Sequence, residues 1–168
     1  ARQIQQQQPQ KPAGYEVEGN IHMYMQRYAE AARSYANAAK WSKNDELIQK
    51  MADARKQAGD VTGAHQALTQ WLAANPDDFK THTALAILLQ SQGKHAEALQ
   101  QYQKVLTKQP KNAIVMNNLA WIYHEQNDPR ALEYAEKAYK EMPDQAAFID
   151  TYGWKKKKKG QADRGLEL

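Results

Sequence analysis

The feature that most constrains this chain is a residue pattern that returns about every 34 positions. In residues 79–112, apolar residues recur at spacings of three and four on both sides of Gly93, which places them on one face of a helix. Pro110 closes this stretch; it follows Pro76 by 34 residues (110 − 76) and precedes Pro143 by 33 (143 − 110). The stretch therefore predicts two amphipathic helices joined by a tight glycine turn, an αα-hairpin.

The same turn position recurs along the chain. Gly59, Asn127 and Gly160 stand at offsets that match Gly93. Small residues within each stretch let two helix backbones approach closely, and larger apolar residues fill the space around them. Because a single hairpin buries little apolar surface by itself, successive hairpins are expected to stack on their neighbours.

The residue order resembles that of the tetratricopeptide repeat family over nearly the whole chain. In residues 79–112 the resemblance lies in Leu85, Ala86, Leu89, Gly93, Ala98, Tyr102, Leu106 and Pro110. It implies an all-α, right-handed α-solenoid of helix-turn-helix repeats, about four of them plus a partial fifth. The expected tetratricopeptide domain covers residues 14–168, with repeats at about 14–44, 45–78, 79–112, 113–145 and a partial 146–168. Residues 1–13 are rich in Gln and Pro and are expected to form a flexible lead, either a linker to an upstream part or the edge of a fragment.

A narrower resemblance covers about a third of the chain. The segments NNLAWIYHEQNDPRALEYAEKAY and DTYGW…GQADRGLEL are similar to tetratricopeptide lipoproteins associated with bacterial exosortase/PEP-CTERM sorting and exopolysaccharide loci. This resemblance implies a role in exopolysaccharide export or protein sorting at the bacterial envelope, and it favours the periplasm over the cytoplasm. The chain contains no Cys, which fits either compartment.

Three positions depart from a regular pattern. Gly19 lies inside the first expected helix, where it costs about 1 kcal/mol relative to Ala, and the family uses such a glycine as a contact point between helices. Trp71 stands where a small residue is usual, so we expect a wider spacing between this hairpin and the next one. The lysine run Lys155–Lys159 replaces apolar positions of the fifth repeat. It is interpreted as a peripheral capping helix, a stretch foreign to the repeat, or a patch for a polyanion.

No pattern of catalytic, metal-binding or cofactor-binding residues emerges. The five His residues include no pair at i, i+4 spacing, and no Gly-Lys-Ser/Thr phosphate loop is present. Asp77 and Asp78 are better interpreted as helix N-cap residues than as a catalytic pair. Without the five clustered lysines the net charge of +4 becomes −1 (4 − 5), which argues against a nucleic-acid-binding domain. No apolar run approaches the length of a membrane span.

The remaining candidate is a binding surface, since in the family the first helix of each hairpin lines a concave groove. The groove positions projected onto this chain are Met23, Tyr24, Gln49, Asp53, Lys56, Thr83, Ile87, Gln90, Asn117, Trp121, His124, Asp150 and Trp154. Trp121 and Trp154 occupy equivalent positions in adjacent repeats, where they either anchor a peptide or pack between neighbouring first helices. Of the residues that clamp a carboxylate in chaperone-binding members of the family, only Asn118 has a counterpart.

The sequence thus favours a non-catalytic scaffold that binds a protein or peptide segment in its groove. The alternative is a self-assembly module that forms a homo-oligomer through its exposed terminal repeats. A weaker third hypothesis is polyanion binding through the lysine run, which would fall steeply with salt.

Overall fold

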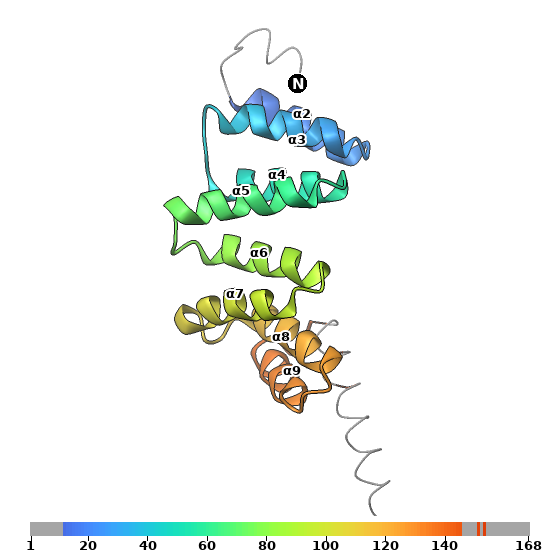
Figure 1. The fold of residues 1–168 in the computed structure, drawn as a ribbon, viewed down its shortest axis with the longest axis vertical. Helices are drawn as coiled ribbons and strands as arrows, with labels where there is room; N and C mark the ends of the chain where they lie inside the picture. Colours follow the sequence, from blue (N-terminus) through green and yellow to red (C-terminus); the bar gives the residue numbers. More distant parts are fainter. Residues whose placement is uncertain (1–11, 146–150, 152, 154–168) are drawn as a thin grey trace, which may run out of the picture. The chain divides into compact units, whose positions relative to one another are not determined.

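The computed structural model describes residues 12–145 together with residues 151 and 153. In that part of the chain every regular element is a helix and no residue forms a strand, so the expectation of an all-α fold of helical hairpins is confirmed (Figure 1). In chain order the helices are α2 (Pro12–Tyr24), α3 (Tyr28–Ala39), α4 (Asp45–Gln57), α5 (Val61–Ala74), α6 (Phe79–Ser91), α7 (His95–Lys108), α8 (Ala113–Glu125) and α9 (Arg130–Glu141).

The chain divides within α6 into two compact units, residues 1–85 and 86–168. Helices α2 to α5 and the first half of α6 belong to the first unit, and the rest of α6 with α7 to α9 belongs to the second. The expectations that concern Asp150, Trp154, Gly160 and Lys155–Lys159 lie outside the described residues, as does nearly all of the expected lead.

The helix pairs α2–α3, α4–α5, α6–α7 and α8–α9 are each joined by the same backbone turn. One residue of each turn has a positive φ: Gln26 (57°), Gly59 (85°), Gly93 (72°) and Asn127 (54°). The N–H of that residue donates to the carbonyl three positions earlier, and the next N–H donates to the carbonyl five positions earlier, at 2.8–3.0 Å. This pair of bonds is the Schellman arrangement, which closes a helix and reverses the chain. The matching offsets in the sequence therefore correspond to matching turns.

In the first unit, α2 packs on α3 through Gly19. A Cβ atom at this position would lie 2.5 Å from the ring of Tyr35, so only glycine allows this approach. Tyr35 is buried, and its hydroxyl donates to Asn20 Oδ1 at 2.8 Å. The expectation that Gly19 is a contact point between helices is confirmed. Earlier in α2, Glu16 accepts from the Lys50 ammonium of α4 at 2.8 Å, which links the first helix to the second hairpin.

Short polar side chains begin several of the helices. Asn44, Asp60 and Asn112 accept hydrogen bonds from the backbone N–H three residues later, at 2.8–3.1 Å. Asp78 does the same for Thr81 at the start of α6, at 3.1 Å. Such caps satisfy backbone donors that have no partner inside the helix. The interpretation of Asp78 as N-cap material is confirmed.

Among the described residues of the second unit, Tyr102 is the largest fully buried side chain. Its hydroxyl donates to Gln90 Oε1 of α6 at 3.0 Å and also bonds Asn118 of α8. Burial raises the pKa of Tyr102 well above its usual range, and the bond to Asn118 only partly offsets this. A further apolar cluster joins α8 and α9 around Met116 and Ala138. One phenol hydroxyl thus connects three helices.

Four residues, 126–129, separate α8 from α9, against three in each of the other hairpins (25–27, 58–60 and 92–94), and an arginine holds this turn. The guanidinium of Arg130 bonds both carboxylate oxygens of Asp128 at 2.6 and 3.0 Å and lies 4.1 Å over the ring of Tyr123. Bonds from Arg130 hold the pKa of Asp128 at about 2. Pro129 stands just before the first residue of the helix, a position at which proline is tolerated.

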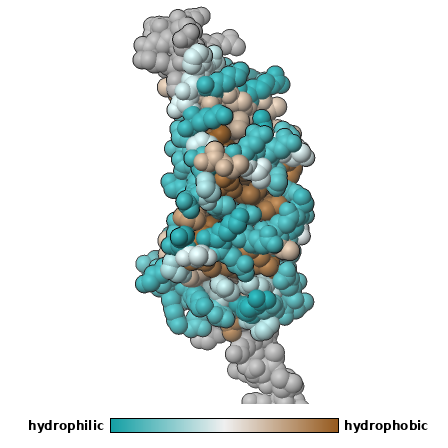
Figure 2. All heavy atoms as spheres, turned by 60° about the vertical axis from the view of Figure 1, so that its left-hand side comes forward, coloured by the Kyte–Doolittle hydropathy of each residue, from teal (hydrophilic) through white to brown (hydrophobic). Residues whose placement is uncertain are grey.

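On the face shown in Figure 2, hydrophilic side chains predominate, and hydrophobic atoms appear mainly in the gaps between them. Within the described residues, no helix is both long and apolar enough to cross a membrane.

Candidate functional site

Helix α8 brings three of the projected groove residues onto one side. Asn117, Trp121 and His124 stand four and three positions apart, a spacing that makes side chains neighbours on a helix. Trp121 is 45% exposed. Its ring meets the His124 ring edge-on, with centroids 6.2 Å apart and planes at 70°. A half-exposed tryptophan held by a histidine edge is the kind of rigid aromatic group that serves as a binding anchor.

Asn117 adds an unsatisfied polar atom to this side of α8. Its Oδ1 is buried and accepts no hydrogen bond from the described residues. A buried acceptor without a partner costs about 1–3 kcal/mol, so proteins rarely keep one without reason. Because this oxygen is buried, a segment bound on the surface of α8 does not contact it in this conformation.

The other projected positions of the second unit differ in what they can offer a ligand. Ile87 on α6 is 41% exposed and presents an apolar side chain. Gln90 is half-buried, and its carbonyl oxygen already accepts from Tyr102. Ile114 on α8 is 55% exposed but was not among the projected positions.

In the first unit, two of the projected residues support the local fold. Gln49 Nε2 donates to the hydroxyl of Thr81 at 3.2 Å, and the Thr83 hydroxyl donates to the carbonyl of Phe79 at 2.9 Å. These bonds join α4 to α6 and stabilise the first turn of α6.

The remaining projected positions of the first unit lie on α2 and α4. Tyr24 is 91% exposed and Asp53 is exposed, whereas Met23 and Lys56 are half-buried.

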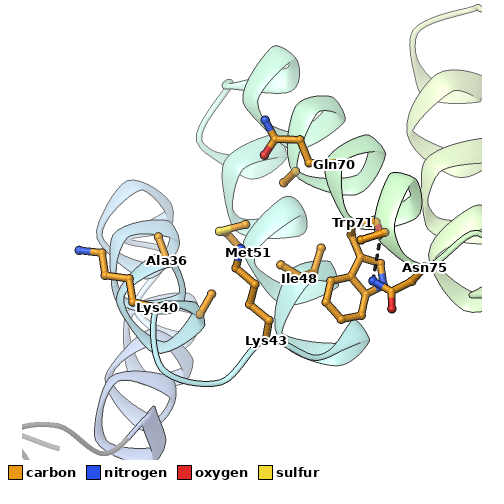
Figure 3. A pocket seen from close by; sticks show the side chains of 11 residues that line it. Ala36, Lys40, Lys43, Ile48, Met51, Gln70, Trp71 and Asn75 are labelled. Atoms are coloured by element: carbon orange, nitrogen blue, oxygen red, sulfur yellow. Dashed lines mark hydrogen bonds between the residues drawn. The ribbon is translucent and has the colours of Figure 1, made fainter.

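A hollow that the sequence did not reveal lies among α3, α4 and α5. Its volume is about 490 Å³. In Figure 3 the indole of Trp71 and the side chain of Ile48 lie next to each other inside it, and Lys43 extends from the connection between α3 and α4 toward Met51. The one sequence signal was Trp71, a large side chain at a position where a small one is usual.

Trp71 is held in place by its polar atoms. The indole Nε1 donates to Asp78 Oδ2 at 2.6 Å, and the backbone carbonyl accepts from Asn75 Nδ2 at 3.1 Å. Burial alone would raise the pKa of the Asp78 carboxyl, but hydrogen bonds from Thr81 and Trp71 outweigh it and hold that pKa below its usual value. The ring of Trp71 therefore offers the hollow only apolar atoms.

Among the described residues, no group of three or more His, Asp or Glu side chains is placed to hold a metal ion.

The profile of the tetratricopeptide repeat family matches residues 77–140. No curated protein sequence matches the chain.

Solved structures share the fold at low sequence identity. YrrB, described as a tetratricopeptide protein with an unusual peptide-binding site, is 22% identical with a TM-score of 0.68; the match covers 87% of this chain and 76% of YrrB. MamA from Desulfovibrio magneticus RS-1 is 20% identical with a TM-score of 0.73, covering 93% and 89% of the two chains. A tetratricopeptide repeat protein from Parabacteroides merdae is 14% identical with a TM-score of 0.74, covering 90% of this chain and 61% of the other.

Proposed function

We propose that this chain, whose residues 77–140 match the tetratricopeptide repeat family, is a non-catalytic scaffold that binds a segment of a partner protein. The observation that carries this proposal is the side of α8 where a half-exposed Trp121 packs against the edge of the His124 ring. The indole supplies a rigid apolar anchor for the bound segment. The peptide-binding site described for YrrB, which shares the fold, supports the same class of partner.

The proposal is tested by selecting peptides from a displayed random library on the immobilised chain and measuring their affinity for variants. Trp121→Ala is expected to weaken the selected peptides more than tenfold, because truncating an aromatic anchor costs about 2 kcal/mol or more. Asn117→Ala should change their affinity much less, because the Asn117 amide oxygen is buried and does not contact the peptide.

Ile114→Ala is the matched control, because Ile114 is an exposed apolar residue of the same helix outside the projected groove. It should change the affinity less than twofold. Peptides that bind Trp121→Ala as tightly as the unmodified chain would refute the site on α8.

We further propose that the partner belongs to a bacterial envelope system for exopolysaccharide export or protein sorting, with the chain in the periplasm. The support is the resemblance of residues 117–139 to lipoproteins of such systems. Neighbouring genes that encode neither exopolysaccharide export nor sorting components would contradict this assignment.

The alternative function, self-assembly, is favoured by the exposed apolar side of α2. Val17, Ile21 and Tyr24 are 39%, 45% and 91% exposed and stand four and three residues apart on this helix. A second copy of the chain could cover them. Light scattering across a concentration series should then show a dimer that Ile21→Glu abolishes, whereas a monomer at every concentration would exclude this function.

A further inference from the structure

We propose that the hollow among α3, α4 and α5 binds a small amphiphilic carboxylate, a molecule with an unbranched apolar body and a single negative charge. The site belongs to the first unit and uses none of the α8 residues, so it is independent of the peptide-binding proposal.

The size and lining of the hollow match those of a small-molecule site. At about 490 Å³ it falls within the range of 300–1,000 Å³ that is typical of ligand pockets. Its apolar walls come from all three helices: Ala36 and Ala39 of α3, Ile48 and Met51 of α4, and Ala67, Trp71 and Ala74 of α5.

The space exists because α3 presents only methyl groups here, while the side chain opposite is fixed. Ala36 and Ala39 are too short to fill the gap, and the indole Nε1 of Trp71 donates to Asp78, which does not line the hollow. This hydrogen bond keeps the indole in place as one wall of the hollow. An apolar ligand bound here would gain about 25 cal/mol of binding free energy for each Å² of apolar surface removed from solvent.

The charge around the hollow favours an anion. No Asp or Glu is among its lining residues, whereas Lys40 and Lys43 are. The Lys40 ammonium donates to Asn37 Oδ1 at 2.9 Å and points away from the other labelled side chains (Figure 3). The Lys43 side chain lies beside Ile48 and Met51 (Figure 3), and none of the ion pairs of the described residues includes it.

The nearest acidic residues along the chain are already engaged. Asp45 pairs with Lys80 at 3.6 Å, and Glu46 pairs with Lys50 at 2.7 Å. One ammonium beside one apolar hollow matches a ligand with one carboxylate and one hydrocarbon body.

A second, smaller hollow of about 260 Å³ shares Ala36 with the first, but Arg33, Arg55 and Asp60 are among its lining residues. This charged lining does not suit a hydrocarbon chain, so the proposal uses the first hollow alone. Each added methylene buries more apolar surface there, and we expect affinity to rise from hexanoate through octanoate to decanoate.

The test is a titration of the isotopically labelled chain with octanoate and with 1-octanol, followed by amide and indole chemical shifts. Octanoate should cause saturable shifts in residues 43–51 and at the Trp71 indole. Lys43→Gln should weaken octanoate two- to fivefold, the strength of an exposed ion pair, and leave 1-octanol unchanged. Lys104→Gln, at an exposed lysine of α7, is the charge control and should change neither ligand.

Steric filling gives a second readout. Ala74→Phe places a ring in the hollow and should abolish binding of both ligands, whereas Ala73→Phe, at the neighbouring exposed alanine that does not line it, should not. Lys43 is exposed between two helices, so its replacement tests the proposal even if Ala74→Phe fails to fold. An absence of saturable shifts, equal binding to both alanine variants, or equal loss of octanoate and octanol in Lys43→Gln would overturn the proposal.

Discussion

Replacing Gly93 by alanine isolates the energetic role of the hairpin turns. Gly93 has a φ of 72°, and a Cβ added there would meet no atom within 4 Å, so the substitution changes only the backbone preference. A side chain in this left-handed conformation costs about 1–2 kcal/mol. Alanine also restricts the unfolded chain, which returns about 0.4–1 kcal/mol. We therefore expect Gly93→Ala to lower the free energy of unfolding by about 0.5–1 kcal/mol.

The chain supplies its own controls for this experiment. Asn127 and Gln26 occupy the equivalent turn positions with φ of 54° and 57°. Gly93→Asn should cost less than Gly93→Ala, because asparagine adopts the left-handed region more readily. Gln26→Gly should stabilise the protein by about 0.5–1 kcal/mol for the converse reason.

Urea unfolding followed by far-ultraviolet circular dichroism measures all three changes. A Gly93→Ala variant at least as stable as the unmodified chain, or a Gln26→Gly variant less stable than it, would refute the backbone argument.

Three further substitutions test packing, capping and buried polar contacts. Gly19→Ala should destabilise the protein by about 1–3 kcal/mol through its clash with Tyr35, and thermal melts should show a much smaller loss when the same change is made in a Tyr35→Ala background. Asp78→Asn should flatten the acid side of the stability profile. The pKa of Asp78 is lower in the folded chain than its unfolded value of about 3.9, so its ionised carboxylate stabilises the fold above that pH. This stability is lost as the pH falls through the folded pKa. The urea midpoints at pH 5 and pH 3 should therefore differ more for the unmodified chain than for Asp78→Asn. Tyr102→Phe should cost about 1–2 kcal/mol in urea unfolding, because it leaves the side chains of Gln90 and Asn118 without the hydroxyl that both of them bond.

Local chemistry made much of the fold predictable. The turn positions could be read from sequence because a positive φ favours glycine or asparagine, and Gly59, Gly93 and Asn127 met that expectation. Gln26 performs the same turn without such a side chain, so composition alone gives no signal for it. Gly19 was recognisable as a contact point, since a glycine inside a helix usually has a packing reason.

The binding surfaces depend more on contacts between distant residues. Helical spacing alone places Asn117 beside Trp121, but the burial of the asparagine oxygen depends on its neighbours in space. Gln90 was projected as a groove residue, and nothing in the sequence indicates that Tyr102 engages it from another helix. The hollow beside Trp71 arises from three helices at once, which no local pattern encodes. The role of the groove in binding stays a prediction.

The hydrogen bond between Trp71 and Asp78 has a consequence for how helix ends open. Asp78 caps α6 through the Thr81 amide, and the same carboxylate receives the indole of α5. Fraying at the end of α5 therefore removes the indole hydrogen bond from Asp78, the residue that caps the first turn of α6. Conversely, unwinding of that turn frees the indole. Solvent exchange at the Thr81 amide and rotation of the Trp71 ring should accordingly share one opening event, so that the junction between these two hairpins opens as a single element.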